Sequence, residues 1–213
     1  MTYHPVLITA GATRNFLDSM RCITANASGK TGAWLACQLP KVTLLGSPSA
    51  ILQLRLLDGT CAATEFSSTQ DLHDKMKEWV HHHPQCIVVH SAAVGDYEAL
   101  PQTGKIPSGQ QELVVRLRPT IKILDQIYGW SERARIVSFK AAPPKISQAE
   151  LIQIARKQLL RTHSSLVFAN ILTQTNHHVQ LVSQATAHAF AQRKDALQHL
   201  LSWIRDAQRL PWS

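Results

Sequence analysis

The loop that follows the apolar segment 6–10 has the residue types of a phosphate site. Ala27, Ser28 and Gly29 are small residues that stand directly before a predicted helix beginning at Lys30. Backbone N–H groups exposed at the amino terminus of a helix, together with the helix dipole, favour a bound phosphate. An ordinary helix start, with the Ser28 hydroxyl capping the first turn, would use the same residues. The residues of this loop alone do not separate the two interpretations.

Two charged residues farther along the chain are also candidates for chemistry. Asp96 follows Val94 and Gly95 at the end of a predicted strand, which is typical of a functional carboxylate and also of a turn. Lys105 lies in the turn-rich segment 104–109 and could close over a phosphate, whereas the residues alone favour a solvated surface lysine. Neither a Walker loop nor the dinucleotide fingerprint G-x-G-x-x-G occurs in the chain. An NAD(P)-dependent oxidoreductase therefore remains an alternative that rests on the sheet pattern only.

The elements expected to position these residues alternate between short apolar strands and helices. Strands are predicted over residues 6–10, 41–45, 86–90, 135–139 and 165–169, and helices over 30–39, 71–82, 121–128, 147–162 and 193–208. Segment 112–118 alternates apolar and charged residues, which predicts a half-exposed antiparallel strand. We therefore expect a single α/β domain over residues 1–213 with a three-layer Rossmann-like architecture. A mostly parallel sheet with a short antiparallel extension is flanked by helices and binds ligands at the carboxyl ends of its strands.

The composition restricts the class of protein. The 213 residues are 45% hydrophobic and 17% charged, with a formal net charge of +8, which indicates a globular protein. The lysines and arginines are scattered, so a phosphate-rich small ligand explains the charge better than nucleic acid does. No apolar stretch is long enough to cross a bilayer and no signal peptide is visible, so we expect a cytoplasmic protein without membrane contact. The four widely spaced cysteines are expected to be reduced core thiols.

A series of short motifs runs in order along nearly the whole chain. They are Leu7-Ile8-Thr9-Ala10-Gly11-Ala12-Thr13, Arg21 with Ile23-Thr24, Ser28-Gly29-Lys30-Thr31-Gly32, Ala92-Ala93-Val94-Gly95-Asp96-Tyr97, Lys105-Ile106, Val137-Ser138-Phe139 and Val167-Phe168-Ala169-Asn170. Together they resemble the phosphopantothenate–cysteine ligase (phosphopantothenoylcysteine synthetase) domain, which is the C-terminal domain type of the DNA/pantothenate metabolism flavoprotein family. The flavin-dependent decarboxylase domain often fused ahead of it in bacteria has no counterpart in this sequence. A separate phosphopantothenoylcysteine decarboxylase is therefore an expected partner.

The resemblance implies a ligase reaction of coenzyme A biosynthesis. Phosphopantothenate would attack the α-phosphate of CTP, or of ATP, in the presence of Mg²⁺, and the amine of cysteine would then displace the nucleotide. The resemblance also implies a homodimer, and it assigns no residue as a metal ligand. It assigns Arg21, Asn26 and Lys105 to catalysis, Gly11, Ser28, Gly29, Ser91, Ala92, Asp96, Ile123 and Phe139 to nucleotide binding, and Lys157 and Arg161 to further phosphate contacts.

Several positions depart from the usual sequence of that family. Where the family has a substrate-handling asparagine, a lysine pair, an acid, two helix lysines and an aspartate, this chain has Ala25, Pro107-Ser108, Lys122, Gln158 with Thr162, and Ile171. Asn26 is one position from the missing asparagine. Lys157 and Arg161 are each one position from a missing helix lysine, and would replace it only if the helix were rotated by about a third of a turn. A catalytically impaired nucleotide-binding homologue, acting as a partner or regulatory subunit, is therefore a second interpretation.

Overall fold

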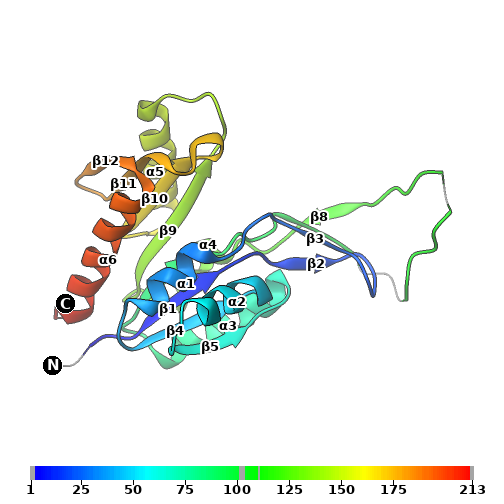
Figure 1. Cartoon of the computed structure of the whole chain (residues 1–213), viewed down its shortest axis with the longest axis horizontal. Coiled ribbons are helices and arrows are strands. Elements are labelled where there is room, and N and C mark those ends of the chain that lie inside the picture. The colour runs from blue at the N-terminus through cyan, green and yellow to red at the C-terminus, as the bar shows by residue number, and fades with distance from the viewer. Residues whose placement is uncertain (1–2, 101–103, 110, 212–213) are drawn as a thin grey trace.

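The fold is built on one large, mostly parallel sheet (Figure 1). The computed structural model describes residues 3–100, 104–109 and 111–211. Its helices are α1 (Lys30–Cys37), α2 (Pro48–Leu56), α3 (Thr69–His82), α4 (Ile123–Trp130), α5 (Gln148–Thr162) and α6 (Arg193–Arg209), with a short 3-10 helix, η1 (Leu172–Gln174). Its strands are β1 (Val6–Ala10), β2 (Arg14–Phe16), β3 (Cys22–Thr24), β4 (Val42–Gly46), β5 (Ala62–Glu65), β6 (Ile87–His90), β7 (Tyr97–Ala99), β8 (Leu117–Pro119), β9 (Arg135–Ala142), β10 (Leu166–Ile171), β11 (His177–Val182) and β12 (Ala187–Gln192).

The order of the strands is that of a doubly wound sheet. Within the described ranges, eight strands follow one another as β12-β11-β10-β9-β6-β1-β4-β5. The six strands from β10 to β5 in this order are parallel to one another. Strand β11 is antiparallel to β10, and β12 is antiparallel to β11. The chain moves from β1 outwards to β4 and β5, returns to β6 on the other side of β1, and continues to β9 and β10. The topological switch point, where such sheets bind ligands, therefore lies between β1 and β6.

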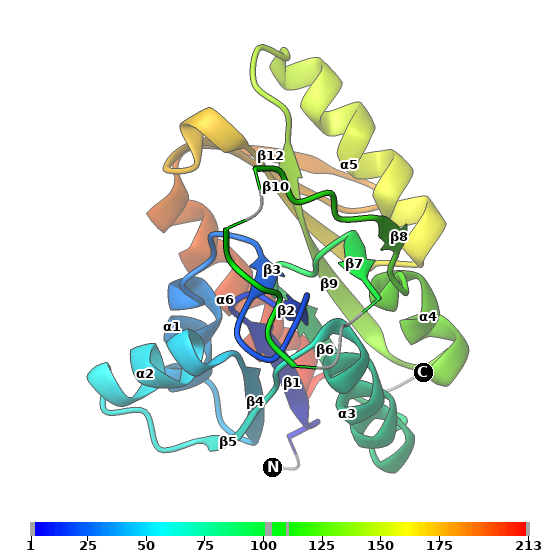
Figure 2. The same cartoon turned by 90° about the vertical axis from the view of Figure 1, so that its right-hand side faces the viewer.

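Helices cover both faces of the sheet, which gives three layers. Figure 2 shows α1 and α2 on one side of the sheet and α3, α4 and α5 on the other. The core under α1, α2 and α6 includes Ile8, Val89 and Val137, whereas the core under α3 and α4 includes Leu7 and Val88. Neighbouring residues of one strand belong to different cores because successive side chains point to opposite faces. The structure thus confirms the expected three-layer, Rossmann-like α/β architecture.

A narrow arm projects from the carboxyl edge of the sheet (Figure 1). We use this name for residues 14–24, 97–100, 104–109 and 111–119, which include the hairpin β2–β3 and the antiparallel pair β7–β8. Asn15 ties the arm to the body. Its Nδ2 donates to the carbonyl oxygen of Tyr97 (3.0 Å), and its Oδ1 accepts from the backbone N–H (3.2 Å) and the hydroxyl (3.0 Å) of Thr69 at the start of α3. The two strand pairs of the arm are separate sheets, and the antiparallel extension of the main sheet is instead made by β11 and β12.

The predicted strands and helices of the body are confirmed to within a few residues at their ends. The strand predicted over 112–118 is wrong for most of its length, because only Leu117–Pro119 pairs, with β7. Helix α2 and strands β2, β3, β5, β7, β11 and β12 are not among the predicted elements. Helix α2 has a recognisable start: Pro48 is at its first position, and the Ser47 Oγ accepts from the backbone N–H of Ala50. Ser47 and Pro48 are also typical of the end of a strand, so the sequence pattern did not predict the helix.

Two expectations from the composition concern the thiols and membrane contact. Within the described residues all four cysteines are free, with Cys86 buried and Cys22, Cys37 and Cys61 half-buried. Burial raises the pKa of Cys86 to about 12 and also raises the pKa of Cys37 and Cys61, which keeps these thiols protonated. Across the described ranges, none of the helices has the length and apolar character needed to span a membrane.

The two ends of the described chain meet at the amino edge of the sheet. The backbone N–H of His4 donates to the carbonyl oxygen of Gln208 (3.0 Å). The Gln208 side chain in turn donates to the carbonyl oxygens of His4 (3.1 Å) and Pro40 (2.8 Å). These bonds join the segment before β1 to the end of α6.

Candidate functional site

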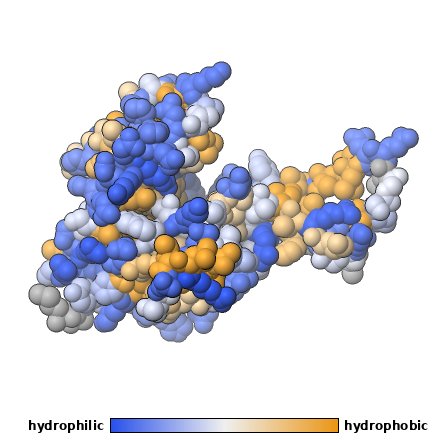
Figure 3. All heavy atoms as spheres, viewed as in Figure 1, coloured by the Kyte–Doolittle hydropathy of each residue, from blue (hydrophilic) through white to orange (hydrophobic). Residues whose placement is uncertain are grey.

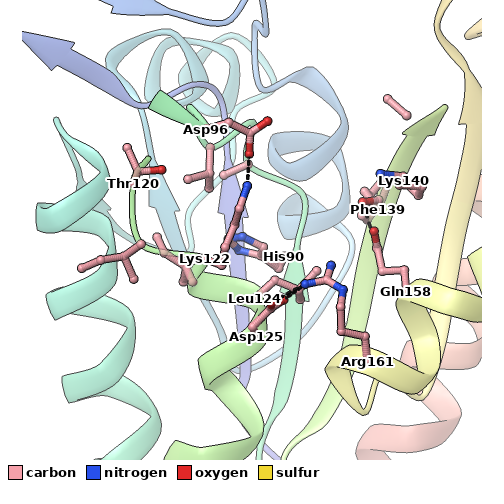
Figure 4. Close-up of a pocket in the computed structure, with 15 residues that line it drawn as sticks. His90, Asp96, Thr120, Lys122, Leu124, Asp125, Phe139, Lys140, Gln158 and Arg161 are labelled. Atoms are coloured by element: carbon pink, nitrogen blue, oxygen red, sulfur yellow. Dashed lines mark hydrogen bonds and ion pairs between the residues drawn. The ribbon is translucent and has the colours of Figure 1, made fainter. Parts of the chain in front are cut away.

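A polar pocket of about 470 Å³ opens at the carboxyl ends of β6 and β9, beside the switch point (Figure 4). Its lining comes from the segment after β6, the turn from β8 into α4, the end of β9 and one face of α5. The lining residues are His90, Ala92, Val94, Asp96, Thr120, Ile121, Lys122, Ile123, Leu124, Asp125, Phe139, Lys140, Ala141, Gln158 and Arg161. A volume of this size is typical of small-ligand sites. We call it the switch-point pocket.

The structure brings four of the predicted nucleotide-binding residues together in this pocket, namely Ala92, Asp96, Ile123 and Phe139, with Arg161 of the predicted phosphate contacts. The ring of Phe139 belongs to the opposite core and stacks on Phe168, with ring centroids 4.9 Å apart. The pocket therefore meets Phe139 through its backbone. Ser91 does not line the pocket: its Oγ donates to the carbonyl oxygen of Thr9 (2.7 Å) and lies against Gly32 of α1.

Helix α5 presents Gln158, and not Lys157, to the switch-point pocket. Lys157 is exposed and lies outside the lining, whereas Gln158 is buried within it. The Nε2 of Gln158 donates to Ser138 Oγ (2.9 Å) and to the carbonyl oxygen of Phe139 (3.2 Å), which fixes this face of the helix against β9. The rotation that would bring Lys157 to the pocket is therefore not present. Arg161, on the same face as Gln158, does line the pocket.

Charged side chains form the rim of the switch-point pocket. The Lys122 ammonium pairs with the Asp96 carboxylate, and the Arg161 guanidinium pairs with the Asp125 carboxylate (Figure 4). Lys140 also lines the pocket and, among the described residues, has no ion-pair partner. The first turn of α4 faces the same space and contributes the positive end of its dipole. Three cations against two carboxylates give a rim that favours an anionic ligand.

A buried histidine forms part of the inner wall of the same pocket. His90 is only 6% exposed, and its Nδ1 lies 2.9 Å from Thr9 Oγ1. The Thr9 hydroxyl oxygen accepts from the backbone N–H of Ala92 (3.2 Å). Within the described chain, His90 Nδ1 is the one acceptor within hydrogen-bond distance of the Thr9 hydroxyl proton. Nδ1 is therefore the acceptor, and the ring proton of the neutral imidazole lies on Nε2. Burial lowers the pKa of His90 to about 4, so the ring is neutral near pH 7.

A second pocket, of about 360 Å³, surrounds the loop before α1. It is lined by Ala12, Arg14, Thr24, Ala25, Asn26, Ala27, Ser28, Ser47, Pro48 and Ser49, and we call it the loop pocket. Asn26 and Ala25 therefore open into the same space. Ser28 does not cap α1, because Gly29 is the N-cap residue and no side chain bonds to the first turn. Of the two interpretations of this loop, the ordinary serine cap is the one that the structure excludes.

Gly11 and Gly29 shape the loop pocket through close packing against α2. Both have positive φ angles, 87° for Gly11 and 78° for Gly29. A Cβ atom on Gly29 would lie 2.4 Å from the Cβ and 2.8 Å from the Cα of Ala50, and one on Gly11 would lie 1.9 Å from Ser47 Oγ. Only glycine accommodates both the backbone angle and the approach. Their contribution to the site is therefore the position of the loop.

Arg21 and Lys105 are brought together on the arm, outside both pockets. Asp18, at the turn between β2 and β3, is buried, and its carboxylate accepts from the backbone N–H groups of Met20 (2.8 Å), Arg21 (2.7 Å) and Ile106 (2.9 Å). These hydrogen bonds, that of Ile106 first, lower the pKa of Asp18. The Arg21 guanidinium donates to the carbonyl oxygen of Ile106 (2.9 Å). The segment that carries Lys105 is thereby fixed to the hairpin turn.

His90, Lys140 and Gln158 are among the residues of the switch-point pocket that the predicted set does not include. His90 is the one polar residue of the strand Ile87–His90, which was the available signal. Lys140 directly follows Phe139, but the alternation of side chains in β9 puts the lysine and the phenylalanine ring on opposite faces. Gln158 stands where the family has a lysine, and nothing in the sequence shows that it faces the sheet.

The strand order and the pocket define the class: a doubly wound α/β protein with a cation-rimmed pocket at its switch point. The chain belongs to the DNA/pantothenate metabolism flavoprotein C-terminal domain family, whose sequence model matches residues 1–205. The family resemblance of the motifs is thereby confirmed.

Curated relatives of this chain are bifunctional proteins of coenzyme A biosynthesis. The chain is 35% identical over 172 residues to the coenzyme A biosynthesis bifunctional protein CoaBC of Thermococcus kodakarensis, which covers 78% of this chain and 41% of the relative. It is 30% identical over 174 residues to CoaBC of Bacillus subtilis, covering 78% and 39%. The chain thus spans about two-fifths of the length of these relatives.

Solved structures share the fold. A DNA/pantothenate metabolism flavoprotein from Streptococcus pneumoniae has a TM-score of 0.83 and 24% identity, and covers 95% of this chain and 99% of that one. A Cab2 mutant in complex with phosphopantothenate-cysteine has a TM-score of 0.75 and 21% identity, and covers 94% of this chain and 85% of that one. At this level of identity the likeness concerns architecture.

Proposed function

We propose that this chain is a phosphopantothenate–cysteine ligase of coenzyme A biosynthesis, acting in the cytoplasm with CTP as the activating nucleotide. The phosphopantothenate carboxylate attacks the α-phosphate of CTP and pyrophosphate leaves; the cysteine amine then attacks the acyl carbon and CMP leaves. Activation is needed because a carboxylate oxygen is a poor leaving group. The observation that carries the proposal is the cation-rimmed pocket at the switch point of a chain from this family.

The charges of the switch-point pocket suit a nucleoside triphosphate. Lys122, Lys140 and Arg161 stand at its rim and would neutralise phosphate oxygens, including the charge that develops on the leaving pyrophosphate. The first turn of α4 would add backbone N–H groups on the same side. Asp96, the ion-pair partner of Lys122, would accept hydrogen bonds from the nucleotide.

The loop pocket is the proposed position of the second substrate. Its lining includes Asn26, whose amide lies one position from Ala25 and opens into the same space, so it can replace the asparagine of the family. Arg21 and the segment that carries Lys105 are joined on the arm, and both residues would approach the anionic groups of the substrates. This arrangement favours the active ligase over the impaired homologue.

Mg²⁺ would enter with the triphosphate. The described residues contain no cluster of three or more His, Cys, Asp or Glu side chains placed to hold a metal ion. Asp96 and Asp125 line the switch-point pocket and offer carboxylate oxygens, which together with substrate phosphates are typical Mg²⁺ ligands. When bound, the ion would supply additional neutralisation of the triphosphate charge.

The direct test is release of pyrophosphate from purified protein with phosphopantothenate, cysteine, Mg²⁺ and CTP, with ATP compared in parallel. Lys140→Ala should lower kcat/KM for CTP by about 10-fold or more, because it removes the unpaired cation of the rim. Lys157→Ala is the matched control, since this lysine is exposed and outside the pocket, and it should stay within about twofold of wild type. No release above a heat-killed control from folded protein would contradict the ligase, whereas CTP binding without turnover would favour the impaired homologue.

We also propose that the chain forms a homodimer through the arm. Apolar side chains are exposed along it, among them Leu100 (67%), Leu113 (45%), Val114 (75%) and Leu117 (45%), and Figure 3 shows this hydrophobic surface. Contiguous exposed apolar surface of this kind marks association sites. In sedimentation velocity the wild-type protein should have the mass of two chains, and Val114→Asp should shift it towards one chain. A wild-type monomer at micromolar concentration would contradict the dimer.

A further inference from the structure

The inner wall of the switch-point pocket is uncharged and carries two side chains with unused hydrogen-bonding groups. His90 and Gln158 are 6% and 7% exposed, and both line the pocket. Among the described residues, neither the Nε2–H of His90 nor the Oε1 of Gln158 has a hydrogen-bond partner. Both groups line the pocket with hydrogen-bonding capacity that no described residue uses, so a ligand in the pocket can use it.

The sheet register fixes the direction of the His90 ring. In the parallel pairing, His90 is the partner of Thr9 in β1 and of Ser138 in β9, so the three side chains form a row on one face. Nδ1 is bound to Thr9, and Nε2, on the other side of the ring, is therefore directed away from β1. Figure 4 shows the imidazole between the Asp96–Lys122 and Asp125–Arg161 pairs.

The amide of Gln158 is also fixed. The carbonyl oxygen of Phe139 can only accept, so the group 3.2 Å from it must be the amide nitrogen of Gln158. The same nitrogen bonds to Ser138, the register partner of His90. The Gln158 oxygen remains as an acceptor beside the row. One neutral wall thus carries a hydrogen-bond donor on His90 and an acceptor on Gln158, while the cations stand at the rim.

We propose that this wall reads the nucleobase, with the Nε2–H of His90 as a specificity-determining donor and Gln158 as an acceptor on the same wall. The inference rests on the proposed function, because it assigns the base end of the nucleotide substrate. A neutral donor does little for a phosphate, which the rim cations serve better. A base edge suits the wall, since it presents an uncharged ring nitrogen or carbonyl oxygen beside an amine or ring N–H. The low pKa of His90 supports this role, because the ring stays neutral throughout the physiological range.

Calorimetric titrations with two probes separate base reading from phosphate binding. CTP carries base and triphosphate, and inorganic tripolyphosphate carries the charge alone; both are titrated with Mg²⁺ present. His90→Asn places its amide near the position of Nδ1, so it can keep the Thr9 contact and loses the donor to the pocket. His90→Gln places an amide nitrogen near the position of Nε2 and is the matched control. His90→Phe is a second donor-free variant in case the asparagine variant does not fold.

The donor-free variants should weaken CTP binding about 10-fold while tripolyphosphate binding stays within about twofold, and His90→Gln should bind CTP nearly as wild type does. An equal loss for both probes, or an unchanged CTP affinity in the donor-free variants, would overturn the assignment. Failure of the ligase is distinguishable: wild-type protein that binds CTP without releasing pyrophosphate contradicts the proposed function and still allows the comparison. Wild-type protein that does not bind CTP contradicts both.

Discussion

Replacing Gly29 with alanine is expected to lower the free energy of unfolding by about 2 to 5 kcal/mol. Two costs combine at this position. The backbone has a φ of 78°, which disfavours any residue with a Cβ atom, and that atom would lie 2.8 Å from the Cα of Ala50 in α2. A backbone atom cannot move aside as the end of a side chain can, so α2 or the loop must shift. Urea denaturation followed by circular dichroism measures the loss.

Two other glycines provide matched controls for Gly29. Gly104 has a φ of 80°, but no atom lies within 4 Å of the place that a Cβ atom would take, so alanine there should cost only the backbone strain, about 1 kcal/mol. Gly129, inside α4, has no positive φ angle and no atom within 4 Å of the Cβ position. Alanine there should leave the free energy of unfolding unchanged or raise it by up to about 1 kcal/mol. Equal losses for the variants at Gly29 and Gly104 would show that contact with α2 contributes nothing.

Asp18→Ala is expected to lower kcat/KM of the ligase reaction by about 100-fold, although Asp18 lines neither pocket. Its carboxylate is the common acceptor for the N–H groups of Met20, Arg21 and Ile106, and alanine would leave all three without their partner. Among the described residues, only the hydrogen bonds of Arg21 to the Ile106 carbonyl oxygen and of Ser19 to the Gly104 carbonyl oxygen would then join the hairpin turn to the segment of Lys105, which would loosen. Steady-state kinetics measures the consequence for turnover, and amide hydrogen exchange should show lost protection at these three positions.

Asp18→Asn tests whether the arrangement or the charge matters. An amide can keep the oxygen that accepts from Met20 and Arg21, but it replaces the oxygen that accepts from Ile106. Its activity should therefore lie between those of wild type and Asp18→Ala. Wild-type turnover and exchange in Asp18→Ala would refute a role for this carboxylate in holding the arm.

The central sheet is the part of the fold that the sequence predicts well. Val6–Ala10 and Ile87–His90 are buried along their whole length, so apart from Thr9 and His90 they consist of apolar residues, which is typical of buried parallel strands. Ala187–Gln192 is mostly exposed and mixes alanine with polar residues, so its pairing with β11 depends on tertiary neighbours that no local pattern records. The residues around Val114 have the sequence pattern of a half-exposed strand, although their apolar side chains are exposed on the arm.

The site is predictable where a residue follows a strand and unpredictable where it depends on a distant partner. Ala92 and Asp96 were identifiable from the motif that follows β6, and both line the switch-point pocket. His90 gains its fixed tautomer from Thr9, 81 positions away in the chain, and Gln158 is oriented by β9. Such relations exist only once the strands are ordered in the sheet, so single-sequence patterns cannot reveal them.

The hydrogen bonds between His4 and Gln208 have a consequence for the architecture of longer proteins. They hold both ends of the described chain at the amino edge of the parallel strands, whereas both pockets open at the carboxyl edge. Additional polypeptide attached at either end would therefore extend from the far side of the sheet and leave both pockets uncovered. Ends that lie this close also suit insertion of the whole domain into another chain, since host residues on both sides would meet without a long connection.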